Sequence, residues 1–253
     1  MLKYLNKHSY LSFLSSAAKD LVHDGDFHSW KIQGRRQLSC DVEITEENID
    51  VLEKFCPTNM FYLSPEEVVL IKSQFIITNK TKYEDVVVNL ESLNFVGNKH
   101  KDIRNYLNRY FKMDLEICSD FKNIEDVKIM LNRWSETLGG KYFQDRSGKN
   151  LFFFKNGFHH DCHNILIYNK GSLIAFAVVS PVQNEHCSYI IGKALCKDYP
   201  GISDFCDVLA FEVAYFAGAK TISMGGGSNK YKLKFSSARL QENYNLKIVG
   251  KKK

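Results

Sequence analysis

The apolar and polar positions follow their clearest order in the C-terminal part of the chain. An apolar run at 188–195 predicts a buried strand, and a turn at 197–201 follows it. Apolar residues then recur at helical spacing over 205–216, and Gly218 is placed to end that helix. A second strand is predicted at 220–224, followed by three glycines and a Lys-rich helix start. Two helix N-termini would then follow two neighbouring strands, an arrangement that suits an anion such as phosphate.

The rest of the chain mixes helices and strands. Residues 1–20 have helical spacing, 22–28 reads as a loop, and 29–43 reads as a hairpin around Gly34. Helices are predicted after Thr45 and Ser64, because each hydroxyl cap is followed by acidic residues. Further strands are predicted at 60–63, 75–78, 86–89, 115–118, 164–168 and 173–179, and further helices at 97–111, 124–138 and 150–158.

Composition places the chain among ordinary globular proteins. It has 253 residues, of which 44% are hydrophobic and 25% charged, so a sizeable core is expected and disorder is not. The seven cysteines include no C-x-x-C pair, which predicts free thiols in a reducing compartment. With no apolar run long enough for a signal peptide or a membrane span, we expect a cytoplasmic protein without stable membrane insertion.

A net charge of +5 permits an anionic partner without requiring one, so the position of the basic residues matters more. On the predicted helix 97–111, Lys101 and Arg104 lie opposite the apolar face, and Lys99 precedes them. These three residues are candidates for binding an acceptor or an anion. A solvated outer face explains the same pattern, and the sequence favours that explanation.

Two other clusters have the residue types of a site. Gly225, Gly226 and Gly227 suit a close approach to a ligand, with Lys232 and Lys234 to steer an anion; a tight turn with solvated lysines is the alternative. The run 159–163 contains three histidines, an aspartate and a cysteine. Strand alternation would point these side chains to opposite sides, so no metal site is expected.

The element order from residue 97 onward resembles that of acetyltransferases of the GNAT superfamily. The run from Tyr83 to Arg109 resembles more closely the tandem-GNAT domain of phosphatidylglycerol lysyltransferases. There, a Tyr-Asp-Tyr-Val-Tyr strand precedes a helix with the pattern Leu-x-Gly-Lys-x-x-x-x-Lys-Arg-Asn. The glycine run and the segment Leu233–Phe235 are similar to the Fem-type aminoacyl transferases, which share the doubled fold.

This resemblance implies an α+β protein of two tandem GNAT-like domains, each with a mostly antiparallel mixed sheet flanked by helices. We expect a degenerate supporting domain at 1–95 and a catalytic domain at 96–253. The resemblance implies an acyltransferase that uses acyl-CoA or aminoacyl-tRNA as donor and no metal. The expected acceptor is an amine on a small molecule, a peptide or a lipid headgroup. The oligomeric state stays open.

Acyl transfer needs a stabilised oxyanion, a group that takes the acceptor's proton, and an aligned donor. Backbone amides around Lys193 are candidates for the first role. Tyr199, Asp198, Glu212 or a water chain are candidates for the second, although the sequence favours a plain polar helix residue at Glu212. A donor phosphate would lie against the turn, whose candidate residues are Lys197, Gly201, Ile202 and Ser203.

The turn departs from the acyl-CoA pattern Arg/Gln-x-x-Gly-x-Gly/Ala, because it has one glycine and a proline. Fewer glycines leave fewer positions where backbone N–H groups can wrap a pyrophosphate. This departure weakens the acyl-CoA donor. It also motivates an alternative function, a binding protein that keeps the GNAT fold and has lost the chemistry.

Overall fold

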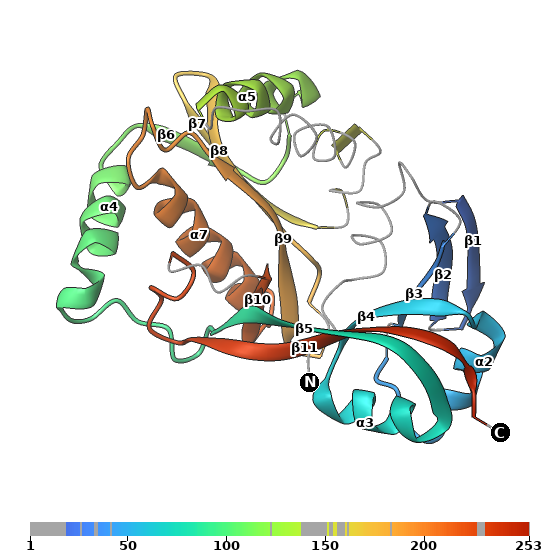
Figure 1. Ribbon diagram of the computed structural model, residues 1–253. Coiled ribbons are helices and arrows are strands. Elements are labelled where there is room, and N and C mark those ends of the chain that lie inside the picture. Colours follow the sequence, from blue (N-terminus) through green and yellow to red (C-terminus); the bar gives the residue numbers. More distant parts are fainter. Residues whose placement is uncertain are drawn as a thin grey trace. The chain divides into compact units, whose positions relative to one another are not determined.

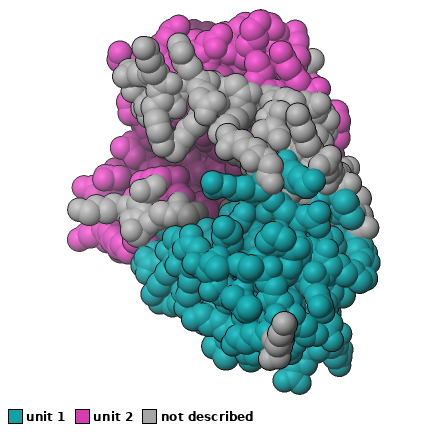
Figure 2. Space-filling model, turned by 45° about the vertical axis from the view of Figure 1, so that its right-hand side comes forward, with its two compact units in different colours: residues 1–86, 226–228, 240–253 teal, residues 87–225, 229–239 magenta. Residues whose placement is uncertain are grey.

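The computed structural model divides the chain into two compact units, shown in different colours in Figure 2. Unit 1 comprises residues 1–86, 226–228 and 240–253, and unit 2 comprises 87–225 and 229–239. The structure describes residues 19–25, 27–32, 35–40, 42–121, 123–137, 151, 154–155, 160, 162–182, 184–226 and 231–252. The predicted helix over residues 1–20 lies almost wholly outside these ranges, as does most of the predicted helix 150–158.

Unit 1 is built on a mixed sheet (Figure 1). Its strands, in spatial order, are β1 (Lys19–Asp24), β2 (Phe27–Ile32), β3 (Arg35–Cys40), β4 (Thr58–Leu63), β11 (Ala238–Lys251) and β5 (Phe75–Asn89). The pairs β1–β2, β2–β3 and β4–β11 are antiparallel, whereas β3 and β4 run parallel. The parallel pair requires a crossover, which the 3-10 helix η1 (Ile49–Val51) and the helix α2 (Leu52–Phe55) provide.

Helix α3 (Pro65–Gln74) follows β4 and begins as the sequence predicts. The Ser64 hydroxyl accepts a hydrogen bond from the Glu67 amide at 3.1 Å, and the Glu67 carboxylate accepts from the Ser64 amide at 2.9 Å. This reciprocal cap satisfies two N–H groups that the helix itself leaves free. The apolar side of the helix, with Val68 and Ile71, packs into a core that includes Leu246 and Ile248 of β11.

Unit 2 contains further strands and the longer helices. Its strands, in spatial order, are β10 (Thr221–Gly226), β9 (His186–Ala194), β8 (Ser172–Val179), β7 (His163–Asn169) and β6 (Leu115–Cys118). Its described helices are η2 (Asn98–His100), α4 (Lys101–Phe111), α5 (Ile124–Thr137) and α7 (Ile202–Phe216). Strands β9 and β10 are parallel, and the other described pairs are antiparallel.

Strand β8 forms the centre of the unit 2 core. Every residue from Leu173 to Val179 is buried, so both faces of this strand are covered. Helices α5 and α7 both pack against β8, and α4 packs against α7. Within the α4–α7 contact, the Phe205 ring lies 5.4 Å from the Tyr110 ring and 5.1 Å from the Phe111 ring, measured between centroids. Aromatic packing therefore fixes the beginning of α7 against α4.

The predicted α+β fold, with mixed and largely antiparallel strands flanked by helices, is confirmed. The hairpin at 29–43 forms as β2 and β3, and Asn169-Lys-Gly171 forms the β7–β8 turn. Gly218 has φ +97° after α7, as expected of a helix terminator. The sequence placed one domain boundary between residues 95 and 96; in the structure, unit 1 ends within β5 and takes residues 240–253 back from the end of the chain.

Several predicted elements differ from the structure. The end of the predicted N-terminal helix and the predicted loop 22–28 contain β1 and the start of β2, because backbone pairing outweighs the local pattern. The two strands at 75–78 and 86–89 are one strand, β5, whose exposed polar middle hides it from the apolar pattern. The predicted helix after Thr45 begins late: residues 46–48 form a turn, and only η1 and α2 are helical. In the turn, the Asn48 side chain accepts a hydrogen bond from the Thr45 amide at 2.9 Å. No helix follows β10 in residues 231–252, which contain turns and β11.

Candidate active site

A cavity of about 230 Å³ in unit 2 is lined by β9, by α7 and by side chains from α5 and β8. Its polar lining residues are Tyr189, Lys193, Ser203, Asp207 and Tyr231. The indole of Trp134 and the ring of Phe176 supply apolar surface. A cavity that combines apolar surface with a few converging polar groups is a usual form of a small-molecule site.

One of the residues that line this cavity, Asp207, has a carboxyl group with only one hydrogen-bonded oxygen. The Tyr189 hydroxyl donates to Oδ1 of Asp207 at 2.8 Å. The other oxygen, Oδ2, is buried and has no hydrogen-bond partner. Asp207 is only 6% exposed. A ligand that carries a hydrogen-bond donor or a positive charge would satisfy this oxygen.

Burial raises the pKa of Asp207 from 3.8 to about 7. The hydrogen bond from Tyr189 and the ammonium groups of Lys234 and Lys232 act in the opposite direction and limit the rise. The pKa of Tyr189 is raised well above its usual value, first by burial and then by the Asp207 charge. Burial, followed by Asp207, also raises the pKa of Tyr231 to about 12. Asp207 is therefore the member of this group that titrates near neutral pH.

The contact between Tyr189 and Asp207 depends on a glycine. A Cβ atom at Gly192 would lie 2.3 Å from the Tyr189 hydroxyl oxygen, closer than any side chain tolerates. The bare backbone at Gly192 lets the tyrosine ring lie across the strand and reach α7. Lys193 follows in β9; its Nζ donates to the Gly192 carbonyl at 3.0 Å and lies 4.8 Å from the Trp134 ring centroid. The Lys193 ammonium is thus held beside the cavity.

The turn before α7 is packed against α4. Gly201 has φ +81°, and a Cβ atom there would lie 2.2 Å from the Tyr106 ring. The Tyr110 hydroxyl donates to the Pro200 carbonyl at 2.9 Å, and the Arg109 guanidinium bonds the same oxygen. One side of this predicted phosphate-binding turn is therefore covered by α4.

The members of the turn differ in exposure. Lys197 is exposed, Ile202 is buried, and Ser203 lines the cavity, where its hydroxyl bonds Asp204 at 3.3 Å. Among the predicted donor-binding residues of the turn, only Ser203 therefore lines the cavity.

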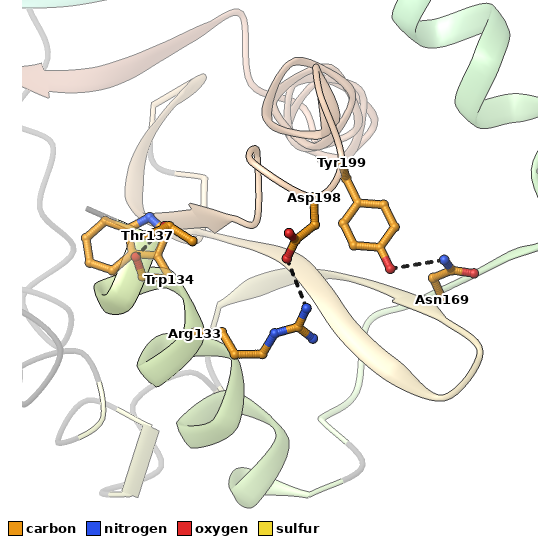
Figure 3. A network of polar contacts seen from close by, with 6 residues as sticks. All are labelled: Arg133, Trp134, Thr137, Asn169, Asp198 and Tyr199. Atoms are coloured by element: carbon orange, nitrogen blue, oxygen red, sulfur yellow. Dashed lines mark hydrogen bonds and ion pairs between the residues drawn. The ribbon is translucent and has the colours of Figure 1, made fainter. Parts of the chain in front are cut away.

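Tyr199 and Asp198 are not among the residues that line the cavity. Figure 3 shows Tyr199 pointing toward Asn169 and Asp198 toward Arg133. Asn169 donates to the Tyr199 hydroxyl at 3.2 Å, and the Arg133 guanidinium bonds the Asp198 carboxylate at 3.0 Å. Glu212 is exposed on α7, and partial burial raises its pKa. Of the three residues that the sequence named as catalytic, only Lys193 lines the cavity.

The lysines that follow the glycine run have partners within unit 2. Lys232 is 7% exposed, and its Nζ donates to the carbonyls of Met224 at 2.7 Å and Gly225 at 3.1 Å. Lys234 forms an ion pair with Asp204. Gly225 and Gly226 end strand β10, and Gly227 lies outside the described residues. The buried Lys232 therefore fixes the end of β10.

The predicted basic surface on α4 is only partly available. Lys99 and Lys101 are exposed. The Arg104 guanidinium donates to the Gly97 carbonyl at 2.7 Å and to the Phe95 carbonyl, so it holds the loop before its own helix. Within the described residues, no group of three His, Cys, Asp or Glu could hold a metal ion, and no helix is long and apolar enough to cross a bilayer. His159 and Asp161 lie outside the described residues.

Sequence reasoning missed Tyr189 and Asp207. One signal for Asp207 was present: it lies on the same helical stripe as Ala210, Phe211 and Ala214, all of which are buried. A charged residue on the apolar stripe of a helix is rare unless it has a partner or a function. The partner, Tyr189, is on another strand, and no spacing rule within α7 identifies it.

The family model described as "Phosphatidylglycerol lysyltransferase, C-terminal" matches residues 39–241. The chain belongs to this family. Among solved structures, L-PGS from Bacillus licheniformis shares the fold with a TM-score of 0.72 at 16% identity, covering 96% of this chain and 87% of that one. No curated protein matches the chain.

Two further solved structures share the fold of this member of the phosphatidylglycerol lysyltransferase C-terminal family. FemX has a TM-score of 0.63 at 10% identity, covering 98% of this chain and 92% of that one. A GNAT-family acetyltransferase from Colwellia psychrerythraea has a TM-score of 0.53 at 9% identity, covering 97% and 90%. At these identities the likeness concerns the fold. The resemblance to the lysyltransferase, Fem and GNAT groups inferred from the sequence is thereby confirmed.

Proposed function

We propose that unit 2 transfers an aminoacyl group from an aminoacyl-tRNA to an acceptor, with the chemistry in the cavity between Lys193 and Asp207. The observation that carries the proposal is the unpartnered Oδ2 of Asp207. An aminoacyl group carries an ammonium, whereas a simple acyl group does not. A buried carboxyl group with a pKa of about 7 ionises readily when a cation enters beside it, because the cation offsets the cost of desolvation.

The turn at residues 197–203, which α4 covers on one side, also supports an aminoacyl-tRNA donor. Acyl-CoA was expected to place its pyrophosphate against residues 197–203, and the Tyr106 ring lies against Gly201 there. An aminoacyl ester of tRNA needs no pyrophosphate site at this position. The FemX and lysyltransferase folds are consistent with an aminoacyl donor.

The family description names lysyl transfer to phosphatidylglycerol, and we extend both partners to this chain as proposals. The glycerol headgroup of that lipid offers hydroxyl groups, not the amine expected from the sequence. In the reaction, the acceptor oxygen would attack the ester carbonyl carbon, and the bond to the ribose oxygen would break. The acceptor's proton leaves and a proton reaches the ribose oxygen, so the exchange of one ester for another is balanced.

The chain's own residues have distinct roles in this scheme. Asp207 pairs with the aminoacyl ammonium and so orients the carbonyl. The Lys193 ammonium stabilises the negative charge that develops on the carbonyl oxygen. Tyr189 holds Asp207 in place through its hydrogen bond. Trp134 provides apolar surface along which the methylene groups of a lysyl side chain can lie.

Transfer of radiolabelled lysine from charged tRNA to phosphatidylglycerol vesicles tests the proposal directly, with labelled acetyl-CoA as the competing donor. We expect labelled lipid with the tRNA donor and loss of that product in Asp207→Asn. Glu136→Gln removes an exposed carboxylate from α5 and is the matched control. Labelling by acetyl-CoA alone would refute the aminoacyl donor. Lysinamide that stabilises the protein without any transfer would instead favour the non-catalytic binding protein.

A further inference from the structure

The lining of the unit 2 cavity includes two cysteines that the proposed transfer does not use. Cys196 lies in the turn after β9, and Cys206 lies in α7. All seven cysteines of the chain are among the described residues and are free, and of these seven only Cys196 is exposed rather than buried or half-buried. A thiol that is exposed and also lines a cavity can react with a small molecule that enters the cavity.

Backbone hydrogen bonds fix the position of Cys196. The Leu195 amide donates to the Ile174 carbonyl of β8 at 2.9 Å, and the Leu195 carbonyl accepts from the Tyr199 amide at 2.9 Å. The turn that contains Cys196 is therefore tied to the sheet on one side and to the start of α7 on the other.

One face of α7 lies opposite this turn across the cavity lining. Ser203, Cys206 and Asp207 follow each other at the i, i+3, i+4 spacing of a helix face, and all three line the cavity. The pKa of Cys206 is raised well above its usual value by burial, and the charges of Asp207 and Cys196 add to the rise. Cys206 is thus within electrostatic reach of both residues and stays protonated, which leaves Cys196 as the reactive thiol of the two.

Asp207 is a second, independent sign of what the cavity binds. Its Oδ2 is buried without a hydrogen-bond partner, and the residue is 6% exposed. Such an oxygen favours a ligand with an ammonium group. A molecule that suits Cys196 as well must carry, close to that ammonium, a sulfur atom that a thiolate can attack.

We propose that Cys196 is a modification site for small disulfides that carry an ammonium group, and that the modification closes the cavity. The Cys196 thiolate attacks one sulfur of the disulfide, so a new S–S bond forms and the old S–S bond breaks. The departing thiolate takes up the proton that Cys196 released, and no further oxidant or reductant is needed. The attached arm keeps its ammonium, which pairs with Asp207. The regulatory consequence rests on the proposed function, because the arm then occupies the place of the aminoacyl ammonium.

The labelling test uses the full chain and two disulfides of equal length. Cystamine carries an ammonium at each end, whereas 2-hydroxyethyl disulfide carries a hydroxyl at each end. Mass spectrometry of the intact protein and of its peptides gives the rate and the position of modification at pH 8, where Asp207, with a pKa of about 7, is mostly ionised. The rate with the neutral disulfide corrects each variant for the intrinsic reactivity of its thiol.

We expect cystamine to modify the wild-type protein at Cys196. The ratio of the cystamine rate to the neutral rate should fall about ten-fold in Asp207→Asn and stay within about two-fold in Glu136→Gln, which removes an exposed carboxylate outside the cavity lining. In the wild type, the same ratio should rise as the pH passes upward through about 7, because Asp207 becomes ionised there. A thiol that reacts only because it is exposed would show neither dependence.

Calorimetric titration with lysinamide tests the closure of the cavity. The cystamine-modified wild type should bind lysinamide at least about ten-fold more weakly than the untreated protein, and dithiothreitol should restore the affinity. In Cys196→Ser, cystamine treatment should change the affinity by less than about two-fold. The comparison is between treated and untreated samples of one variant, so it does not depend on the affinity that the serine variant starts from.

Three outcomes would overturn the proposal: labelling at other cysteines but not at Cys196, equal rate ratios in the wild type and Asp207→Asn, or an unchanged lysinamide affinity after labelling. A disulfide between Cys196 and Cys206, recognised by the loss of two hydrogens without an added arm, would also overturn it. Absence of aminoacyl transfer by the untreated protein would refute the proposed function and leave the labelling result standing, so the two failures are distinguishable.

Discussion

The Tyr189 hydroxyl donates to Oδ1 of Asp207 at 2.8 Å, while Oδ2 of the same carboxyl group has no partner. The protein thus fixes the position of the carboxyl group and leaves half of its bonding capacity unused. Burial of such a group destabilises the free protein, and a bound ligand can recover the difference.

Asp207→Asn should make the free protein more stable above neutral pH. In the wild type, the folded pKa of about 7 exceeds the ordinary 3.8, so the folded state binds more protons between these values. The free energy of unfolding contributed by Asp207 is therefore fully present below about pH 4 and is lost as the pH rises through about 7. That rise in pKa corresponds to a loss of about 4 kcal/mol of stability when Asp207 is ionised. The buried asparagine amide would itself lack a partner, which costs about 1–3 kcal/mol and offsets part of the gain from the substitution.

Urea unfolding across this pH range measures the effect. The variant should gain about 1–3 kcal/mol at pH 8, lose the pH slope, and lose aminoacyl transfer. Glu136→Gln should keep the wild-type slope. An Asp207→Asn protein with an unchanged slope would show that Asp207 does not titrate in this window.

Tyr189→Phe should raise the pKa of Asp207 further, because the hydrogen bond from Tyr189 acts to lower it. The carboxyl resonance of Asp207, followed by 13C NMR over a pH titration, measures the change. Tyr199→Phe serves as the control, since its hydroxyl bonds Asn169 outside the cavity. A shift in the Tyr199 variant, or none in the Tyr189 variant, would contradict the assigned hydrogen bond.

Gly192→Ala should displace the Tyr189 ring and weaken binding of lysinamide by about ten-fold. The added Cβ would lie 2.3 Å from the tyrosine oxygen, and overpacking of this kind costs about 1–3 kcal/mol of stability. Gly250→Ala is the control, because a Cβ atom there meets nothing within 4 Å. Calorimetric titration with lysinamide compares the two, and equal affinities would refute the dependence on Gly192.

Gly201→Ala should be more destabilising than Gly218→Ala. Both glycines have positive φ, +81° and +97°, so each alanine is strained by about 1 kcal/mol. Only Gly201 also faces a ring, that of Tyr106, which adds about 1–3 kcal/mol. Thermal unfolding of the two variants gives the difference. Equal losses would show that α4 moves away from the turn at little cost.

The sequence predicted well those features that depend on neighbouring residues. The cap at Ser64 and Glu67, the turn at Asn169–Gly171 and the helix end at Gly218 all follow local rules and all formed. Strand β5 was missed because its polar middle is stabilised by backbone pairing, which leaves no apolar pattern. The turn at Lys232 was missed because the carbonyls that hold this lysine, Met224 and Gly225, belong to another element.

The candidate site was harder to predict than the fold. Lys193 lines the cavity, whereas Tyr199 and Glu212 do not. Both were chosen for their chemical type within a short stretch of sequence. Burial raises the pKa of Asp207, and the hydrogen bond from Tyr189 of β9 limits that rise. Both effects exist only after the sheet and α7 have packed. The sequence signal for Asp207 is a charged residue on the otherwise apolar face of α7.

The course of the chain also sets the order in which a ribosome can complete the protein. Strand β4 must pair with β11, and the intervening residues include most of unit 2. Leu246 and Ile248 complete the core around α2 and α3, so that core stays partly uncovered until the segment 240–251 has been synthesised. Unit 1, begun first, is finished after unit 2, and a fragment cut at residue 95 would lack the strand that closes its core.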